Sequence, residues 1–316
     1  MATTRQSIIK GPGTILFQDK TFFDVSGINA SIESATTDIS ASVSGKIDTI
    51  KTDQSAKISM TPIASMEEAA NGIFFPDYVK NPKIGQSLFG TEDMPLTIHS
   101  TAGTAVKFAA AALTKCPELY LSPVKTCFGS AEWTALLPNG ATPNGTTKLY
   151  TVEQKEYTAG YPSKNYLTGL HWTGKLGDLS ISDTVDGWTV TVDMATEPVT
   201  VDSVGTIDYI LTGVKVSARC TPIGLSEEDI LAALPVFKPR GASIAQTGVD
   251  LVLESSNVIG LKSSYDITLR NVALVSGPLN WGSTSLRAGE LMFTASVNDS
   301  GSLFDITPVL QSGSSM

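Results

Sequence analysis

Two segments of the chain alternate between apolar and polar residues, the pattern of β-strands with one buried and one exposed face. The apolar positions are Ala56, Ile58 and Met60 in the first segment, and Val214, Val216, Ala218 and Cys220 in the second. All of these positions are even-numbered, so the two strands keep the same phase, and a slip of one residue would turn either apolar face to water. Residues 131–135 and 291–295 alternate in the same way. The pattern predicts a mainly β protein.

A Thr-Pro-Ile turn follows each alternating segment, and a short predicted helix follows the turn. The helices read "SMEEAANG" from Ser65 and "SEEDILAAL" from Ser226. Serine caps helix N-termini, and an acid three residues on, here Glu68 and Asp229, completes a capping box. The adjacent acids at each helix start could be read as an acid/base couple. The positive end of the helix dipole favours the capping interpretation.

The chain also repeats itself at an offset of 160 residues. The segment "GKIDTIKT" from Gly45 matches "GTIDYILT" from Gly205, and Trp133-Thr-Ala matches Phe293-Thr-Ala. A shared offset at both ends predicts a duplicated domain. The predicted domains are residues 1–150 and 151–316, with a linker at about 137–155 that contains the Pro- and Asn-Gly-rich "LPNGATPNGTT".

Composition narrows the possible functions. The net charge is −9 and no basic run occurs, which argues against binding nucleic acid through its phosphates. No stretch is long and apolar enough for a membrane helix, and we expect neither a membrane partner nor an export signal. The three cysteines, Cys116, Cys127 and Cys220, are irregularly spaced and are predicted to be free thiols.

Motifs for chemistry are missing from the sequence. The two histidines lie in different predicted domains, and no nucleophile elbow, zinc motif or phosphate-binding loop occurs. We therefore expect no enzyme activity, catalytic residue, metal or cofactor. Trp172 and Trp188 fit core positions better than a ligand platform. With Asp178, Asp183 and Asp186 they form the one cluster that a carbohydrate-binding or hydrolytic β-sandwich would use.

Two stretches carry a resemblance to a known family: "ISMTPIASMEEAANGIFFPDYVKNPKIGQSLFGTEDMPLTIHSTAG", residues 58–103, and "CPELYLSPVKTCFGSAEWTALL", residues 116–137. The order is strand, Pro turn, short helix, loop, a Pro-Leu strand and a closing aromatic-Thr-Ala strand. It resembles the major tail tube proteins of long-tailed bacteriophages. The second half echoes this order in "VSARCTPIGLSEEDILAALP" and "GELMFTA", but "GVDLVLESS" departs from the Pro-Leu strand.

The resemblance implies two tandem tail-tube-like β-sandwich domains, each with a flanking α-helix and a long β-hairpin, at residues 34–61 and 188–221. It implies a structural virion protein, assembled in the host cytoplasm, whose stacked rings form the conduit for DNA. Two domains per chain would make each ring a trimer with pseudo-sixfold symmetry. Expected partners are further copies of the chain, a tape measure protein, terminator or baseplate proteins, and DNA in transit. Residues 2–13 and 138–145 are the predicted contacts between rings.

Four acidic residues of the predicted hairpins, Asp38, Asp48, Asp193 and Asp208, are candidates for the surface that lines the conduit. An acidic lining would repel phosphates and let DNA slide. The competing interpretation places these residues at turns or in pairs with Lys46, Lys57 or Lys215. Alternatives to the tube subunit are a tail terminator, distal tail or baseplate ring protein. A secretion-system tube protein is disfavoured, because such proteins are usually single-domain.

Overall fold

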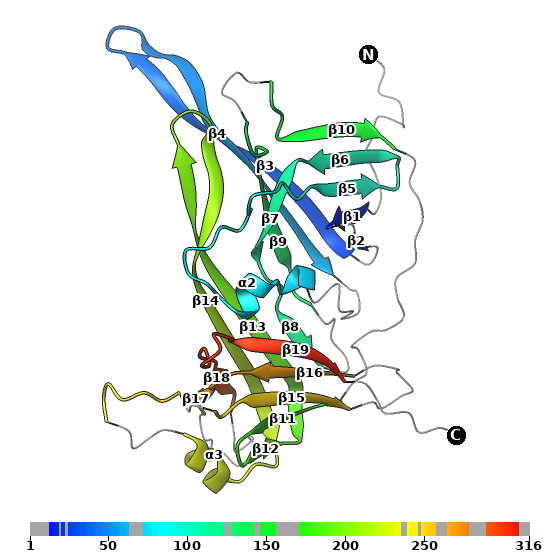
Figure 1. Cartoon of the computed structure of the whole chain (residues 1–316), viewed down its shortest axis with the longest axis vertical. Helices are drawn as coiled ribbons and strands as arrows, with labels where there is room; N and C mark the ends of the chain where they lie inside the picture. Colours follow the sequence, from blue (N-terminus) through cyan, green and yellow to red (C-terminus); the bar gives the residue numbers. More distant parts are fainter. Residues whose placement is uncertain are drawn as a thin grey trace.

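The computed structural model describes residues 13–18, 20–22, 25–62, 72–122, 128–141, 146–155, 171–234, 239–245, 248–256, 264–277 and 289–309. Within these ranges the chain is mainly β, as the alternating pattern predicts, with a few short helices (Figure 1). The strands form four antiparallel sheets, which can be compared with the four blades of a β-propeller.

Two of the sheets, the hairpin sheets, are each built around one long hairpin. The first contains, in order across the sheet, β3 (Val25–Ala41), β4 (Gly45–Pro62), β9 (Ala131–Leu136) and β7 (Ala110–Lys115). The second contains β17 (Ala273–Ser276), β18 (Leu291–Thr294), β14 (Gly205–Ile223), β13 (Asp183–Val201) and β8 (Leu119–Leu121). Both hairpins lie where the sequence predicts them and are longer than predicted.

The other two sheets, the cover sheets, pack on the hairpin sheets. The first contains β10 (Tyr150–Gln154), β6 (Thr104–Phe108), β5 (Leu96–Ser100), β1 (Gly13–Phe17) and β2 (Lys20–Phe22). The second contains β12 (Leu179–Ile181), β11 (His171–Leu176), β15 (Leu251–Ser256), β16 (Ser264–Leu269) and β19 (Phe304–Val309). With the strands taken in chain order, the two cover sheets have the same strand order.

Aromatic side chains fill the space between each cover sheet and its hairpin sheet. In the first half, Phe17 of β1 meets Trp133 of β9 edge to face, with ring centroids 5.8 Å apart. In the second, Trp188 of β13 stacks at a tilt on Phe293 of β18, 5.7 Å away, and lies directly over Gly174 of β11. A Cβ at Gly174 would approach the indole to 2.2 Å, so the core requires glycine there.

The pairing registers of the two halves repeat at the predicted offset of 160. In the first half Ile58 lies opposite Trp133. In the second half Ala218 lies opposite Phe293, and these two residues are 160 positions after Ile58 and Trp133, respectively. The pairs Met60–Ala131 and Cys220–Leu291 agree in the same way. The residues that the alternation predicts to be buried in these strands are buried, except Val214, which is partly buried.

Helix is scarce in the described part of the chain, as the sequence predicts. α3 (Glu227–Ala233) begins at Ser226, whose Oγ accepts a hydrogen bond from the Asp229 N–H while the Asp229 carboxylate accepts one from the Ser226 N–H. This capping box is confirmed. The equivalent pair, Ser65 and Glu68, lies outside the described residues. The short helix α2 (Asp77–Lys80), which starts after Pro76, was not predicted from the pattern.

We predict that Trp133→Ala and Phe293→Ala each lower the free energy of unfolding by about 3–5 kcal/mol, because each removes a fully buried aromatic ring. Chemical denaturation followed by fluorescence or circular dichroism would measure the loss. Val43→Ala, at a hairpin turn residue that is 96% exposed, is the control and should change little. A loss below about 1 kcal/mol at either aromatic would contradict the packing described here.

Candidate functional site

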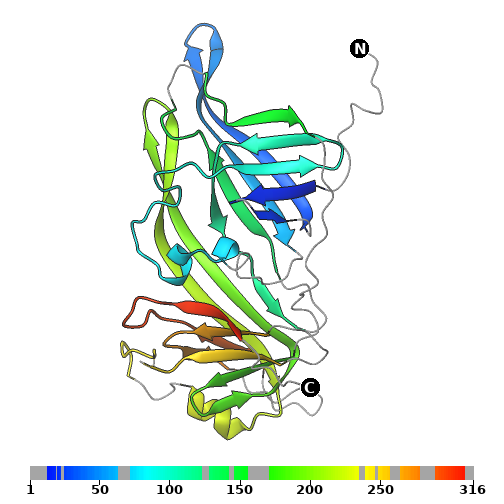
Figure 2. The ribbon, with the colours of Figure 1, turned by 45° about the vertical axis from the view of Figure 1, so that its right-hand side comes forward.

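The two long hairpins extend beyond the cores of their halves (Figure 2), and residues 42–52 of the first hairpin are exposed. Each turns over three residues and re-enters its second strand at a glycine, Gly45 or Gly205, with φ of +70° and +87°. Such backbone angles favour glycine, which explains why both copies of the Gly-x-Ile-Asp repeat begin with it.

Three register shifts interrupt each hairpin, and the two β-bulges nearer the turn repeat at the offset of 160. β4 carries one extra residue at Thr52 and another at Ile47. β14 carries extra residues at the equivalent Thr212 and Ile207. A bulge places two residues opposite one and changes the phase of alternation beyond it. Between its two bulges, each second strand (residues 48–51 of β4 and 208–211 of β14) therefore presents its odd and even positions on faces opposite to those near the core, whereas β3 and β13 keep their phase there.

The registers place Asp38 and Asp48 on opposite faces of the first hairpin. Asp38 lies opposite Thr49 and receives a hydrogen bond from its hydroxyl at 2.9 Å. Asp38 therefore shares the face of the hairpin that continues from the core. Asp48 lies opposite Ile39 and occupies the other face.

The four predicted aspartates differ in their partners. Asp38 pairs with Lys46 at 2.7 Å, which is the competing interpretation of that residue. Asp48 and Asp208 each accept a hydrogen bond at 2.7 Å from the N–H of the next residue, Thr49 or Tyr209. Asp193 lies opposite Lys215 across the hairpin, and no ion pair joins the two side chains within the described residues.

Three of these four residues share one face, the outward face, which points away from the cover sheets. In the first hairpin this face carries Glu33, Asp48, Asp53 and Lys57. In the second it carries Asp193, Glu197, Asp208, Lys215 and Arg219. Acidic side chains outnumber basic ones on it. The outward positions of both hairpins are therefore mostly acidic and do not include Asp38, although Asp53 and Asp208 among them also bond to the other half.

The junction between the halves is formed partly by backbone pairing. The loop that contains Gly85–Leu88 runs antiparallel to the edge of β14, with Ser87 opposite Ile210. The N–H of Gly85 donates to the Leu211 carbonyl at 2.8 Å, the N–H of Leu211 donates to the Gln86 carbonyl at 2.9 Å, and that of Leu88 donates to the Tyr209 carbonyl at 2.9 Å. The loop therefore acts as an added strand on an open edge.

Strand β8 adds a second backbone contact between the halves. It belongs to the first half in sequence but pairs with β13 of the second, with Tyr120 opposite Thr189. The approach is close at Gly187, where a Cβ would lie 2.4 Å from the Leu121 carbonyl oxygen. The second hairpin is thus held by the first half along both of its edges.

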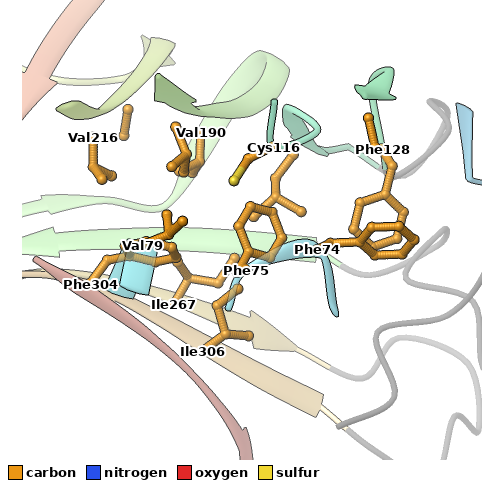
Figure 3. Packing of buried hydrophobic residues seen from close by; sticks show 14 of the residues in the cluster. Phe74, Phe75, Val79, Cys116, Phe128, Val190, Val216, Ile267, Phe304 and Ile306 are labelled. Atoms are coloured by element: carbon orange, nitrogen blue, oxygen red, sulfur yellow. The ribbon is translucent and has the colours of Figure 1, made fainter. Parts of the chain in front are cut away.

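Apolar packing joins the halves as well. Figure 3 shows Phe75 and Val79 of the first half facing Ile267, Phe304 and other apolar residues of the second. Phe75 and Phe304 meet edge to face with ring centroids 5.8 Å apart. The buried residues of both halves form one continuous cluster. The junction is therefore part of the core.

At the tip of the second hairpin, Asp53 of β4 binds residues of β14. Its carboxylate accepts hydrogen bonds from the Thr206 hydroxyl at 2.6 Å and from the Thr206 N–H at 3.2 Å. A Cβ on Gly205 would lie 2.4 Å from the Asp53 Oδ1. A cavity of about 340 Å³ lies beside this contact and is lined partly by Asp93 and Asp208. Both carboxylates accept backbone hydrogen bonds, from Asn139 and Tyr209, and serve structure there.

The tryptophans and cysteines singled out in the sequence are, where the structure describes them, part of the buried core. Trp172 and Trp188 are buried, as the core interpretation predicts, so they present no platform for a carbohydrate. Cys116 and Cys220 are buried free thiols, and burial raises the pKa of both. Cys127, residues 2–12 and residues 142–145 lie outside the described residues.

Among the described residues, no three His, Cys, Asp or Glu side chains are grouped to hold a metal ion. None of the described helices has the length and apolar character to cross a membrane.

Comparison of the sequence with protein-family models and with curated proteins finds no match to either.

We predict that Gly205→Ala destabilises the chain more than Gly45→Ala. Both substitutions place a side chain at positive φ, which costs roughly 1–2 kcal/mol. Only the alanine at 205 would also collide with Asp53, because a Cβ at Gly45 meets nothing within 4 Å. Denaturant unfolding of the two variants would measure the difference. Equal losses of stability would show that the Asp53–Thr206 contact does not hold the hairpin tip.

Proposed function

We propose that this chain is the tail tube subunit of a long-tailed bacteriophage, with two tail-tube-like β-sandwich domains. Its copies would form trimeric, pseudo-hexameric rings that stack into the conduit for DNA ejection. The observation that carries the proposal is the pair of long hairpins with equivalent turns, bulges and registers, side by side in one chain. In a pseudo-hexameric ring of three chains, each chain would supply two of the six equivalent hairpins, so a duplicated hairpin is expected.

The path of the chain between the sheets favours an architecture of two β-sandwiches and disfavours a β-propeller. A propeller blade is a four-stranded sheet repeated around a central channel. Here the chain leaves each cover sheet for the hairpin sheet after two strands and returns to it twice. The repeated unit is thus a pair of sheets, which is the architecture expected of a sandwich domain.

Exposed strand edges support an assembling protein. β3 pairs with β4 on one side, and no described strand pairs with its other side. Apolar side chains on the first hairpin are open to solvent, including Ile47 at 60% and Ile50 at 47% exposure. Long exposed edges with apolar side chains invite further strands. Burial of both tryptophans removes the cluster on which a carbohydrate-binding module depended.

We predict that the purified protein forms rings or tubes with threefold subunits and a central hole at high concentration. Negative-stain electron microscopy and sedimentation across a concentration series would detect them. Discrete single rings that never stack would favour a terminator, distal tail or baseplate role. A monomer at every concentration, also in the presence of the phage's tape measure and baseplate proteins, would contradict the proposal.

We predict that neutralising the outward face slows the passage of DNA and leaves assembly intact. The variant is Asp48→Asn with Asp208→Asn, because asparagine keeps the Oδ1 that accepts the backbone hydrogen bonds. Loss of negative charge weakens repulsion of phosphates. DNA ejection from virions, or retention of DNA by assembled tubes at low salt, would measure the effect.

Asp38→Asn is the matched control for this experiment, since Asp38 lies on the opposite face of the same hairpin. It removes one negative charge but none from the outward face. Equal effects of Asp38→Asn and the double substitution would indicate a general change of charge. Unchanged ejection and retention in the double variant would contradict an acidic lining.

A further inference from the structure

The loop that pairs with β14 has a counterpart in the second half, displaced by 156 positions. The first reads "GQSL", Gly85–Leu88, and the second reads "GASI", Gly241–Ile244. Both glycines have positive φ, +89° and +87°. The residue after each glycine donates its N–H to the carbonyl two residues before it, from Gln86 to Lys83 and from Ala242 to Pro239. These are equivalent β-turns with glycine at the third position.

The edge that receives the first loop also has a counterpart, displaced by 160 positions. Leu211 of β14 pairs with the loop through its N–H and its carbonyl, and its equivalent in β4 is Lys51. Lys51 lies opposite Thr36 as Leu211 lies opposite Thr196, so its N–H and carbonyl point to the same open edge.

The neighbouring aspartates reinforce the equivalence. Asp208 accepts hydrogen bonds from the Tyr209 N–H and from the Phe89 N–H of the docked loop, at 2.7 and 3.4 Å. Asp48 already makes the first of these bonds, with Thr49 at 2.7 Å. The edge of β4 therefore already has the backbone conformation that the equivalent edge of β14 has with its loop bound.

A single chain cannot join these two surfaces. The Gly241–Ile244 loop lies beside α3 at one end of the molecule, and the tip of the β3–β4 hairpin lies at the other end (Figures 1 and 2). Residues 239–243 and residues 46–52 are exposed in the chain. A second copy of the chain is the partner that carries the complementary surface.

We propose that Gly241–Ile244 of one copy adds as a short antiparallel strand to β4 of a second copy at Thr49–Lys51. The Gly241 N–H donates to the Lys51 carbonyl, the Lys51 N–H to the Ala242 carbonyl, and the Ile244 N–H to the Thr49 carbonyl. The contact between copies thus repeats the contact within the chain. This inference rests on the proposed ring and specifies which surfaces close it.

The contact joins two different surfaces, so each copy offers one of each. Such head-to-tail contacts form a closed ring when the rotation between copies closes, and an open filament otherwise. One difference between equivalent residues, Leu211 and Lys51, distinguishes the contact within a chain from the contact between copies. Leu211 is buried with Leu88, whereas Lys51 would lay its aliphatic stem along Ile244 and keep its ammonium in water. The contact between copies is therefore the more polar of the two.

Cysteine cross-linking tests the proposed register. Ser87 and Ile210 are direct partners within the chain, so Ser243 and Ile50 are the equivalent pair between copies. Facing residues of antiparallel strands lie about 4.5–5.5 Å apart at Cα, within the range that a disulfide spans. We expect Ser243→Cys with Ile50→Cys, in a Cys127→Ser background, to form disulfide-linked dimers and trimers on oxidation with oxidised glutathione.

Two further pairs act as controls. Ser87→Cys with Ile210→Cys should form a disulfide within one chain and no multimers, which checks the internal template. Ser243→Cys with Thr37→Cys places the second thiol on β3, across the hairpin from the proposed edge, and should form no multimers. Non-reducing electrophoresis measures the products, and electron microscopy of the same samples records whether rings form.

The outcomes separate this inference from the proposed function. Multimers from the Ser243–Ile50 pair alone support both the ring and its register. If rings or tubes form without this disulfide, the proposed contact is wrong and the tube function is unaffected. The same conclusion follows if both the Ser243–Ile50 and the Ser243–Thr37 pairs give multimers. Absence of particles and of intermolecular disulfides, also in the presence of the phage's tape measure and baseplate proteins, overturns both.

Discussion

The pairing of the β14 edge by the first half is the interaction on which the arrangement of this chain depends. β14 is longer than its neighbour β18, which pairs only with residues 217–220. Its backbone groups nearer the turn need other partners or water. The Gly85–Leu88 loop supplies partners along part of that edge, and Asp53 supplies them at the tip. The second hairpin is thus held against the first half along this edge.

Because the first half supplies these partners, the two halves are not independent modules. β8 crosses to the second hairpin sheet, and Phe75 meets Phe304 inside one continuous core. The junction therefore fixes the relation between the two hairpins with the rigidity of a packed interior. A fixed relation is useful to a protein whose repeated units occupy neighbouring places in a ring, as proposed here.

Sequence reasoning predicts the strands near the core and their equivalence, because buried positions leave an alternating apolar pattern. The pairs Ile58–Trp133 and Ala218–Phe293 follow from it directly. The pattern ends where the hairpins leave the core, since both faces there are open to solvent. The bulge at Thr52 leaves no apolar signal, so the sequence gives no means of assigning Asp38 and Asp48 to opposite faces.

The junction was beyond sequence reasoning for a different reason. Its loop is specified by backbone geometry, and the two copies share only Gly85/Gly241 and Ser87/Ser243 among their four residues. The offset of 156 also differs from the 160 of the strands, so an ungapped comparison misses it. Glycine followed two residues later by serine, after a Pro-containing segment, was the available signal. It becomes informative only once the structure shows the equivalent turns.

The positions at which the halves differ are consistent with one junction inside the chain and one between copies. Leu211, buried at the internal junction, corresponds to Lys51 on an exposed edge. Asp53, which ties the tip of the second hairpin, corresponds to Gly213 and so has no counterpart that could tie the first. Both differences remove buried or bonded groups from the surface left to a second copy. Contacts between copies would then be weaker than the internal junction, so chains would remain folded before they assemble.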